Sequence, residues 1–242
     1  MSVRTPSLHT PQPHTTPNHG SGVVLDKVVL VRGQSRVFEG LSLHLHEPRI
    51  GLIGDNGAGK SSLFRLICGL ERPNAGQVKV LASASVGMMF QNPDEQIIFP
   101  TVEEELGLSL QACGLTRQAA RTQAREWLVA RGLGSWAERA IGSLSQGQRQ
   151  QVCWLALLIA PHGLLLLDEP FSSLDLPGQA QLDQEITQAS QQVIVSTHVL
   201  QHIRHFERVI WLDQGAVRLD GPGHEVCAAY EADVARRSLR RA

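Results

Sequence analysis

The stretch that decides the fold reads Gly54-Asp55-Asn56-Gly57-Ala58-Gly59-Lys60-Ser61, a complete GxxxxGK(S/T) pattern. An apolar segment, Arg49–Ile53, precedes it, and an apolar helical stripe, Leu63–Ile67, follows it. Glycines let backbone N–H groups curl around phosphate oxygens, and the following helix adds the positive end of its dipole. Lys60 then supplies a charge to the β- and γ-phosphates, and Ser61 offers a hydroxyl to Mg²⁺. The stretch predicts a nucleotide-binding P-loop between a strand and a helix.

A second chemical element follows the apolar run Leu164–Leu167, which ends in Asp168 and Glu169. An acidic pair at a strand end is, taken alone, more often a solvent-exposed pair than a site. In a chain with a P-loop, Asp168 is placed to hold Mg²⁺, directly or through water, and Glu169 to polarise an attacking water. The two elements together predict nucleotide hydrolysis.

The hydrophobic periodicity and turn residues in the rest of the chain predict the α/β fold class. Two stretches with period-two alternation indicate an antiparallel pair, short apolar runs indicate buried parallel strands, and a Gln-Gly turn indicates a closing hairpin. Residues about 102–160 are mostly helical in pattern. We therefore expect one α/β core with an inserted helical lobe, its strands at Val23–Val31, Arg36–His46, Gln192–Ser196, Arg208–Asp213 and Ala216–Leu219.

Composition narrows the function. The chain has 242 residues, 42% hydrophobic and 19% charged, with a formal net charge of −1, which disfavours both a disordered chain and a general nucleic-acid binder. Its four cysteines form no CxxC pair, so buried free thiols are expected rather than a zinc site or a disulfide framework. No apolar run approaches the roughly 20 residues of a spanning helix. Any work at a membrane would need a partner as anchor.

The two ends of the chain differ in composition from the middle. Residues 1–22 are rich in Pro, Thr and His and predict a disordered tail. His9, His14 and His19 could bind a metal, but flexible, spaced histidines bind weakly, so low-complexity filler is the preferred interpretation. Residues 231–242 predict a short basic tail, either solvated or in contact with anionic lipid.

A P-loop alone leaves kinases, GTPases and motors open, and four further motifs distinguish among them. They are Leu144-Ser145-Gln146-Gly147-Gln148, Gln91 after Met88-Met89-Phe90, Ser172-Ser173-Leu174-Asp175, and Ser196-Thr197-His198. In this order and spacing the chain resembles the ATP-binding cassette (ABC) ATPases over residues 23–230. The resemblance implies a RecA-like P-loop core with an antiparallel β subdomain and a helical subdomain at about 92–160.

The resemblance also implies residue roles. ABC cassettes act as head-to-tail homodimers that use ATP and Mg²⁺, so the P-loop of one copy would face the Ser145–Gln148 signature of the other. Glu169 would be the general base, and His198 would contact the γ-phosphate. Ser61, Gln91 and Asp168 would hold Mg²⁺. The implied ATP-binding residues are Gly54, Asp55, Asn56, Gly57, Ala58, Gly59, Lys60, Ser61, Ser62, Gln91, Ser145, Gln146, Gly147, Gln148 and Asp175.

Three positions depart from the family's usual pattern. Arg32 stands where an aromatic ring often stacks on adenine; a guanidinium can also stack on a base, although an exposed loop arginine is an equal interpretation. Gln146 replaces a glycine, and Ser62 replaces a threonine. None of these changes removes a catalytic group.

The segment Phe90–Glu105, FQNPDEQIIFPTVEEE, is similar to the ATPases of energy-coupling-factor importers. That group implies a peripheral protein at the cytoplasmic face of the cell membrane, with a transmembrane coupling subunit and a small substrate-capture membrane protein as partners. Ile97–Phe99 would receive a coupling helix, unless the lobe itself covers these side chains. Several features are similar to the biotin branch and make biotin the expected solute, with cobalt or nickel as alternatives. They are Arg49–Gly54, the signature Leu144–Gln148 with Arg149, Val152-Cys153, Asp168–Phe171, Arg208–Leu212 and Cys227–Tyr230.

Two other classes compete with a transport motor. A soluble ABC ATPase acting on nucleic acid or ribosomes would have a long coiled coil between Lys60 and Ser145, or a second cassette, and this chain has neither. A nucleotide-dependent scaffold without turnover would lack the general base or the histidine that contacts the γ-phosphate. Glu169 and His198, the residues implied for these roles, are both present. An ATPase that drives import is therefore the preferred interpretation.

Overall fold

The computed structural model describes residues 22–81 and 85–239. Its first sheet is antiparallel, with the order β2-β1-β4. Alternating apolar side chains in these strands, such as Leu41, Leu43 and Leu45, point to one buried face. The strands are β1 (Val23–Arg32), β2 (Ser35–Leu45) and β4 (Ala75–Val80).

The second sheet has six strands in the order β5-β6-β7-β3-β8-β9. All neighbours are parallel except the hairpin β8-β9. Continuous Val, Ile and Leu runs form the central strands, as expected where helices or a second sheet cover both faces. The strands are β3 (Arg49–Ile53), β5 (Val86–Met89), β6 (Leu164–Asp168), β7 (Gln192–Ser196), β8 (Arg208–Asp213) and β9 (Ala216–Gly221).

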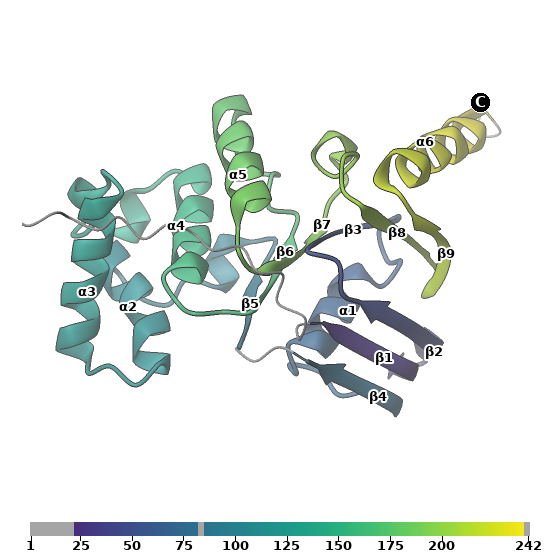
Figure 1. Ribbon diagram of the computed structural model, residues 1–242, viewed down its shortest axis with the longest axis horizontal. Coiled ribbons are helices and arrows are strands. Elements are labelled where there is room, and N and C mark those ends of the chain that lie inside the picture. The colour runs from purple at the N-terminus through teal and green to yellow at the C-terminus, as the bar shows by residue number, and fades with distance from the viewer. Residues whose placement is uncertain (1–21, 82–84, 240–242) are drawn as a thin grey trace, which may run out of the picture.

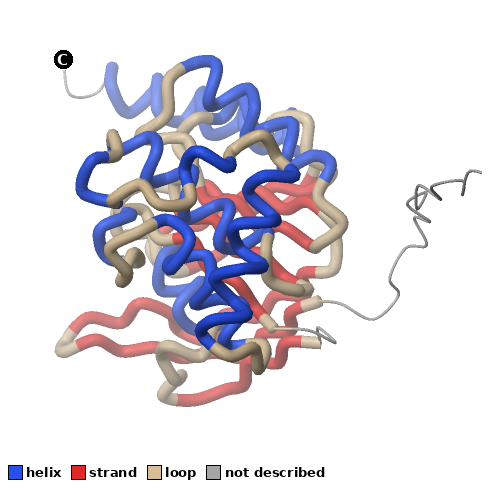
Figure 2. Tube along the Cα trace, turned by 90° about the vertical axis from the view of Figure 1, so that its left-hand side faces the viewer, coloured by secondary structure: helices blue, strands red, loops and turns tan. Residues whose placement is uncertain are grey.

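The helices fall into two groups (Figure 1). Figure 2, seen from the side of the lobe, shows helices lying in front of the strands. Those of the core are α1 (Lys60–Ile67), α5 (Leu176–Gln188) and α6 (Gly223–Leu239). The inserted lobe, at the left of Figure 1, contains α2 (Val102–Ala112) and α3 (Arg117–Ala130). Between the groups lies α4 (Gln146–Leu158). The result is the expected α/β class with an antiparallel sheet and a helical insertion.

Adjacent residues of the buried strands supply two different cores. Leu164 and Leu166 of β6 pack with the first sheet and α1, whereas Leu165 and Leu167 pack with α4 and α5. Helix α4 has the same double character, because Trp154 faces the sheet while Leu155 faces the lobe. The signature motif therefore begins a helix that belongs to two cores.

The C-terminal segment differs from the expected short basic tail at 231–242. Helix α6 continues through Leu239, and Arg237 contacts both Asp233 and the P-loop residue Asp55. The sequence pattern did not predict this helical segment, because the arginines and small residues of 231–242 resemble a solvated charge run. The expected histidine-rich tail lies outside the described residues, apart from Gly22.

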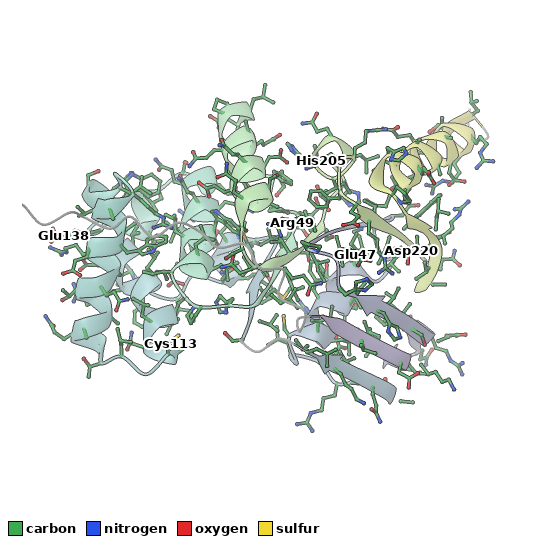
Figure 3. The ribbon with its side chains drawn as sticks, in the orientation of Figure 1. Glu47, Arg49, Cys113, Glu138, His205 and Asp220 are labelled. Carbon is green, nitrogen blue, oxygen red and sulfur yellow. The ribbon has the colours of Figure 1, made fainter. Side chains whose placement is uncertain are left out.

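Ion pairs join distant parts of the sequence on the surface of the core. Arg208 of β8 pairs with Glu47 at 3.0 Å and with Asp220 of β9 at 2.7 Å. In Figure 3 these two carboxylates lie on the core, and Cys113 and Glu138 lie on the helical lobe.

All four cysteines are free thiols, with Cys113 exposed. In the described part of the chain, no helix combines the length and apolar character that a membrane crossing requires.

Replacing Leu166 by Ala tests the central core. This side chain is 0% exposed, so the substitution leaves a cavity. We expect the free energy of unfolding of the full chain to fall by about 2–5 kcal/mol in urea titrations followed by circular dichroism. Leu70→Ala, at a side chain 63% exposed, is the control and should change it by less than about 0.5 kcal/mol. Equal losses would contradict the burial of β6.

Candidate functional site

A cleft of about 570 Å³ lies where the parallel strands end. Ligands of open α/β sheets bind at this edge, because loops at the carboxyl ends of the strands leave a crevice there. The P-loop follows β3, Asp168 and Glu169 end β6, and His198 follows β7. The cleft is lined by Arg32, Ser35, Val37, Asn56, Gly57, Gly59, Lys60, Ser61, Ser62, Gln91, Asp168, Glu169 and His198.

The P-loop depends on glycine at two positions. Gly54 has φ 147°, and a Cβ there would lie 2.1 Å from the carbonyl oxygen of Leu212. Gly59 has φ 107°, and a Cβ there would lie 2.8 Å from the Phe38 ring. Both positions therefore require the absence of a side chain for the loop to lie against β8 and β2.

Lys60 is buried at the base of the cleft and is held by its own loop. Its Nζ donates to the carbonyl of Gly54 at 2.6 Å and to that of Asp55 at 3.2 Å. Burial lowers the pKa of this amine, and the carboxylates of Glu169 and Asp168 oppose that effect. The amine is thus placed on the same cleft as the two acids, where it can meet a phosphate.

Glu169 combines burial, an unusual backbone and a histidine neighbour. Its φ is 50°, in the left-handed region that non-glycine residues rarely adopt. Oε2 accepts the backbone N–H of His198 at 3.2 Å, and Oε1 lies 3.3 Å from His198 Nε2. Oε1 makes no hydrogen bond within the described residues. Burial raises the pKa of this carboxyl, which suits a group that accepts a proton.

The residues expected to hold Mg²⁺ share this cleft. Ser61, Gln91 and Asp168 offer a hydroxyl, an amide and a carboxylate, which are the hard oxygen ligands that Mg²⁺ takes. Within residues 22–81 and 85–239 no cluster of three or more His, Cys, Asp or Glu could hold a metal by itself. The donor set fits an ion held by one or two side chains together with substrate phosphates.

The signature residues lie in a different hollow. Ser145, Gln146, Gly147 and Gln148 line a depression of about 520 Å³ together with Asp175. Ser145 caps α4: its Oγ accepts the Gln148 N–H at 3.2 Å, and the Gln148 side chain accepts the Ser145 N–H at 3.1 Å. The structure therefore does not bring the signature to the P-loop of the same chain.

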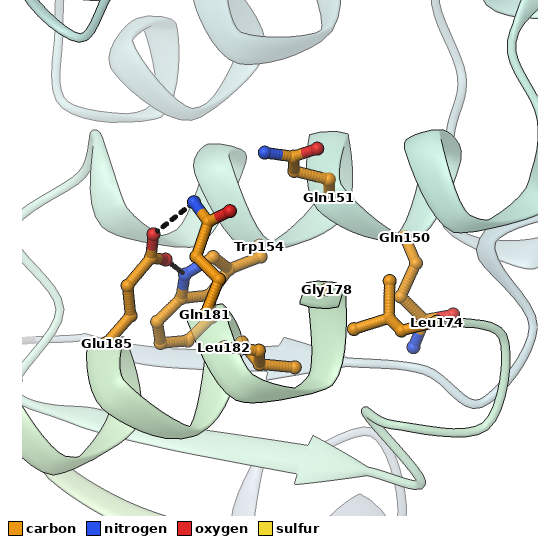
Figure 4. A pocket seen from close by; sticks show the side chains of 8 residues that line it. All are labelled: Gln150, Gln151, Trp154, Leu174, Gly178, Gln181, Leu182 and Glu185. Carbon is orange, nitrogen blue, oxygen red and sulfur yellow. Dashed lines mark hydrogen bonds between the residues drawn. The ribbon is translucent and has the colours of Figure 1, made fainter. Parts of the chain in front are cut away.

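Packing of α4 on α5 places this second hollow. The indole of Trp154 donates to Glu185, and Leu182 packs in the same cluster (Figure 4). The cavity that these helices leave is only about 40 Å³, too small for a nucleotide. Asp175 caps α5 by accepting the Gly178 N–H at 3.0 Å.

Some expected contacts fall outside the cleft, and others were missed. Gly54, Asp55 and Ala58 do not line it, and the Asp55 side chain bonds to Tyr230 and Arg237 of α6. Ser35 and Val37 of β2 also line the cleft. The sequence did not predict this, because no motif includes these two residues. Arg32 does line it, and Glu71 holds its guanidinium in a two-point pair.

Residues 38–172, more than half of the chain, match a family described as ABC transporter. This chain belongs to the ABC transporter family. It is an ATPase of that family, as expected, and the expected fold is confirmed. The P-loop, the acidic pair and the signature of this ABC protein all lie within the matched span.

Relatives of this ABC ATPase include proteins of biotin transport. It is 43% identical over 225 residues to the biotin transport ATP-binding protein BioM of Rhodobacter capsulatus, covering 89% of this chain and 95% of that protein. It is 34% identical over 207 residues to BioM of Rhizobium etli, covering 82% and 92%. The expected resemblance to the ATPase of a biotin importer is confirmed.

Two solved structures share the fold. The first is cbiO1 of Clostridium perfringens, part of the ABC transporter complex cbiONQ, with a TM-score of 0.72 and 21% identity, covering 92% of this chain and 96% of that one. The second is the dimeric post-hydrolysis cassette MJ0796 bound to ADP and Pi, with a TM-score of 0.71 and 24% identity, covering 83% and 98%. At these identities the likeness shows the fold alone.

The raised pKa of Glu169 predicts how the ATPase activity of this ABC protein depends on pH. The carboxyl must be ionised to accept a proton, so kcat/KM for ATP should fall with decreasing pH at an apparent pKa above 4.5, the ordinary glutamate value. Steady-state rates from about pH 4 to about pH 8 measure this. ADP affinity over the same range is the control for binding. An acid limb at or below 4.5 would contradict the assignment.

Proposed function

We propose that this chain is the ATP-hydrolysing subunit of an energy-coupling-factor importer for biotin. The observation that carries the proposal is the joining of Lys60, Asp168, Glu169 and His198 in one cleft of a chain 43% identical to a biotin transport ATP-binding protein. The FQNPDEQ segment supports the importer type through its resemblance to energy-coupling-factor ATPases.

Hydrolysis follows from the positions of these side chains. The Glu169 carboxylate takes a proton from the attacking water, and its tie to the His198 backbone N–H holds it toward the cleft. Lys60 and the P-loop amides bind the phosphate oxygens, while His198 faces the γ-phosphate. Ser61, Gln91 and Asp168 are the residues that would hold Mg²⁺, which neutralises phosphate charge when bound.

The separation of the two hollows supports a head-to-tail homodimer. A cleft with the P-loop and base but without the signature is incomplete, and the Ser145–Gln148 hollow is its missing half. The exposed start of α4 offers backbone N–H groups and a positive dipole end to a phosphate. One ATP would then join the P-loop of one copy to the signature of its partner.

An apolar segment of the lobe is the proposed docking site for a transmembrane coupling subunit. Ile98 is 73% exposed, between the half-buried Ile97 and Phe99. Buried Glu105 fixes this backbone, because its Oε2 accepts the N–H groups of Ile98 at 2.9 Å and Phe99 at 2.8 Å. A fixed backbone that presents an apolar side chain suits a partner helix. Docking there would place the protein at the cytoplasmic face of the membrane.

The docking segment is also tied to the signature helix. Arg149 on the first turn of α4 pairs with Asp94 at 2.7 Å, and Asp94 lies on the short turn that precedes Ile97. The pair gives a direct route from the proposed partner to the signature hollow. A small substrate-capture membrane protein would complete the importer.

Uptake measurements test the proposal as a whole. Deleting the gene in its host should abolish uptake of labelled biotin, a restored wild-type copy should recover it, and a Glu169→Gln copy should not. Cobalt and nickel uptake are measured in parallel. Loss of metal uptake instead of biotin uptake would overturn the solute, and retention of all three would favour a soluble ABC ATPase.

Ile98→Asp tests the docking segment. A charge on this exposed position should cut solute uptake about tenfold or more, because burying an unpaired carboxylate in an interface is costly. The ATPase activity of the isolated subunit should stay within about twofold, since the side chain is exposed in the free protein. Val129→Asp, at a 62% exposed side chain of the same lobe, is the matched control. Equal uptake by both variants would contradict the docking site.

A further inference from the structure

The P-loop of this chain contains a carboxylate where the loop must accept phosphate. Asp55 is the second residue of the loop, and its carbonyl accepts a hydrogen bond from Lys60 Nζ at 3.2 Å. An ionised carboxylate beside a polyphosphate site opposes binding of the anion by Coulomb repulsion. The loop therefore needs a compensating charge close to Asp55.

Helix α6 supplies that charge. Arg237 pairs with Oδ2 of Asp55 through Nη1 and donates to Oδ1 through Nη2 at 3.2 Å. The Tyr230 hydroxyl donates to the same Oδ1 at 2.9 Å. The contacts of Arg237 join residues 182 positions apart in sequence, and α6 lies beyond the span that matches the family. The pairing with Arg237 lowers the pKa of Asp55 to about 2.

The two residues that hold Asp55 are themselves held from behind. Asp233, one turn before Arg237, is buried and lies 2.9 Å from its Nε. Arg218 of β9 donates to Asp233 at 2.8 Å. The Tyr230 ring packs edge-on against Trp211 of β8, with ring centroids 5.1 Å apart. The guanidinium is thus positioned by the sheet rather than left on a flexible helix end.

We propose that α6 is an electrostatic clamp on the P-loop, in which Arg237 neutralises Asp55 and turns its carboxylate away from the nucleotide cleft. The geometry supports this directly, because Asp55 does not line the cleft although its loop neighbours Asn56 and Gly57 do. Arg237 is a positioning residue, since it acts on the nucleotide through Asp55. The inference rests on the proposed function only in that the cleft binds ATP.

Nucleotide titrations of the full chain test the clamp. Arg237→Ala should weaken binding of Mg²⁺-free ATP about three- to tenfold by calorimetry, with a smaller loss for ADP, which has less charge. The loss should shrink at high salt. Arg237→Lys, which keeps a charge at this position, should recover most of the affinity. Arg236→Ala is the matched control, because this neighbour reaches Asp233 but not Asp55, and it should change affinity by less than about twofold.

A double-mutant cycle separates charge from folding. In an Asp55→Asn background, Arg237→Ala should change ATP affinity by less than about twofold, because no carboxylate remains to neutralise. Equal losses in both backgrounds, or no loss in the single variant, would overturn the clamp. Circular dichroism of each variant shows whether α6 is retained. Failure of the unaltered chain to bind ATP would instead refute the nucleotide site itself.

Discussion

The burial of the central strands on both faces is the constraint on which the rest of the molecule depends. Alternate residues of β6 supply opposite cores, so no position within the strand is free for a polar group until it ends at Asp168. The same holds for β7, whose residues through Ser196 are buried. Polar chemistry is therefore confined to the strand ends. Because neighbouring parallel strands end at one edge, the P-loop, the acidic pair and His198 meet there.

Helix α4 connects the helical lobe to the core. Its buried residues divide between the sheet and the lobe, and its first turn bears both the Ser145 cap and the ion pair of Arg149 with Asp94. A displacement of the lobe must consequently alter the position of the signature hollow. The signature hollow and the proposed docking segment therefore meet at the first turn of α4.

Much of the fold and of the site could be read from the sequence, because its signals are local. Strand β3, the P-loop and the glutamate that follows β6 lie within short segments whose spacing is diagnostic. Strand β4 was not foreseen, since its residues are mostly exposed and include Gly76 and Lys79, and β5 is only four residues long. The pairs Arg32–Glu71 and Asp55–Arg237 could not be foreseen either, because they depend on how distant elements pack.

The packing of Tyr230 against Trp211 has an optical consequence. Tyr230 is the single tyrosine of the chain, and Trp211 is one of four tryptophans. With ring centroids 5.1 Å apart, the phenol is close enough to transfer excitation energy to this indole. We therefore expect weak tyrosine emission from the folded protein and stronger emission when α6 leaves the sheet. The Tyr230–Trp211 pair is thus an intrinsic fluorescence probe for the position of the C-terminal helix.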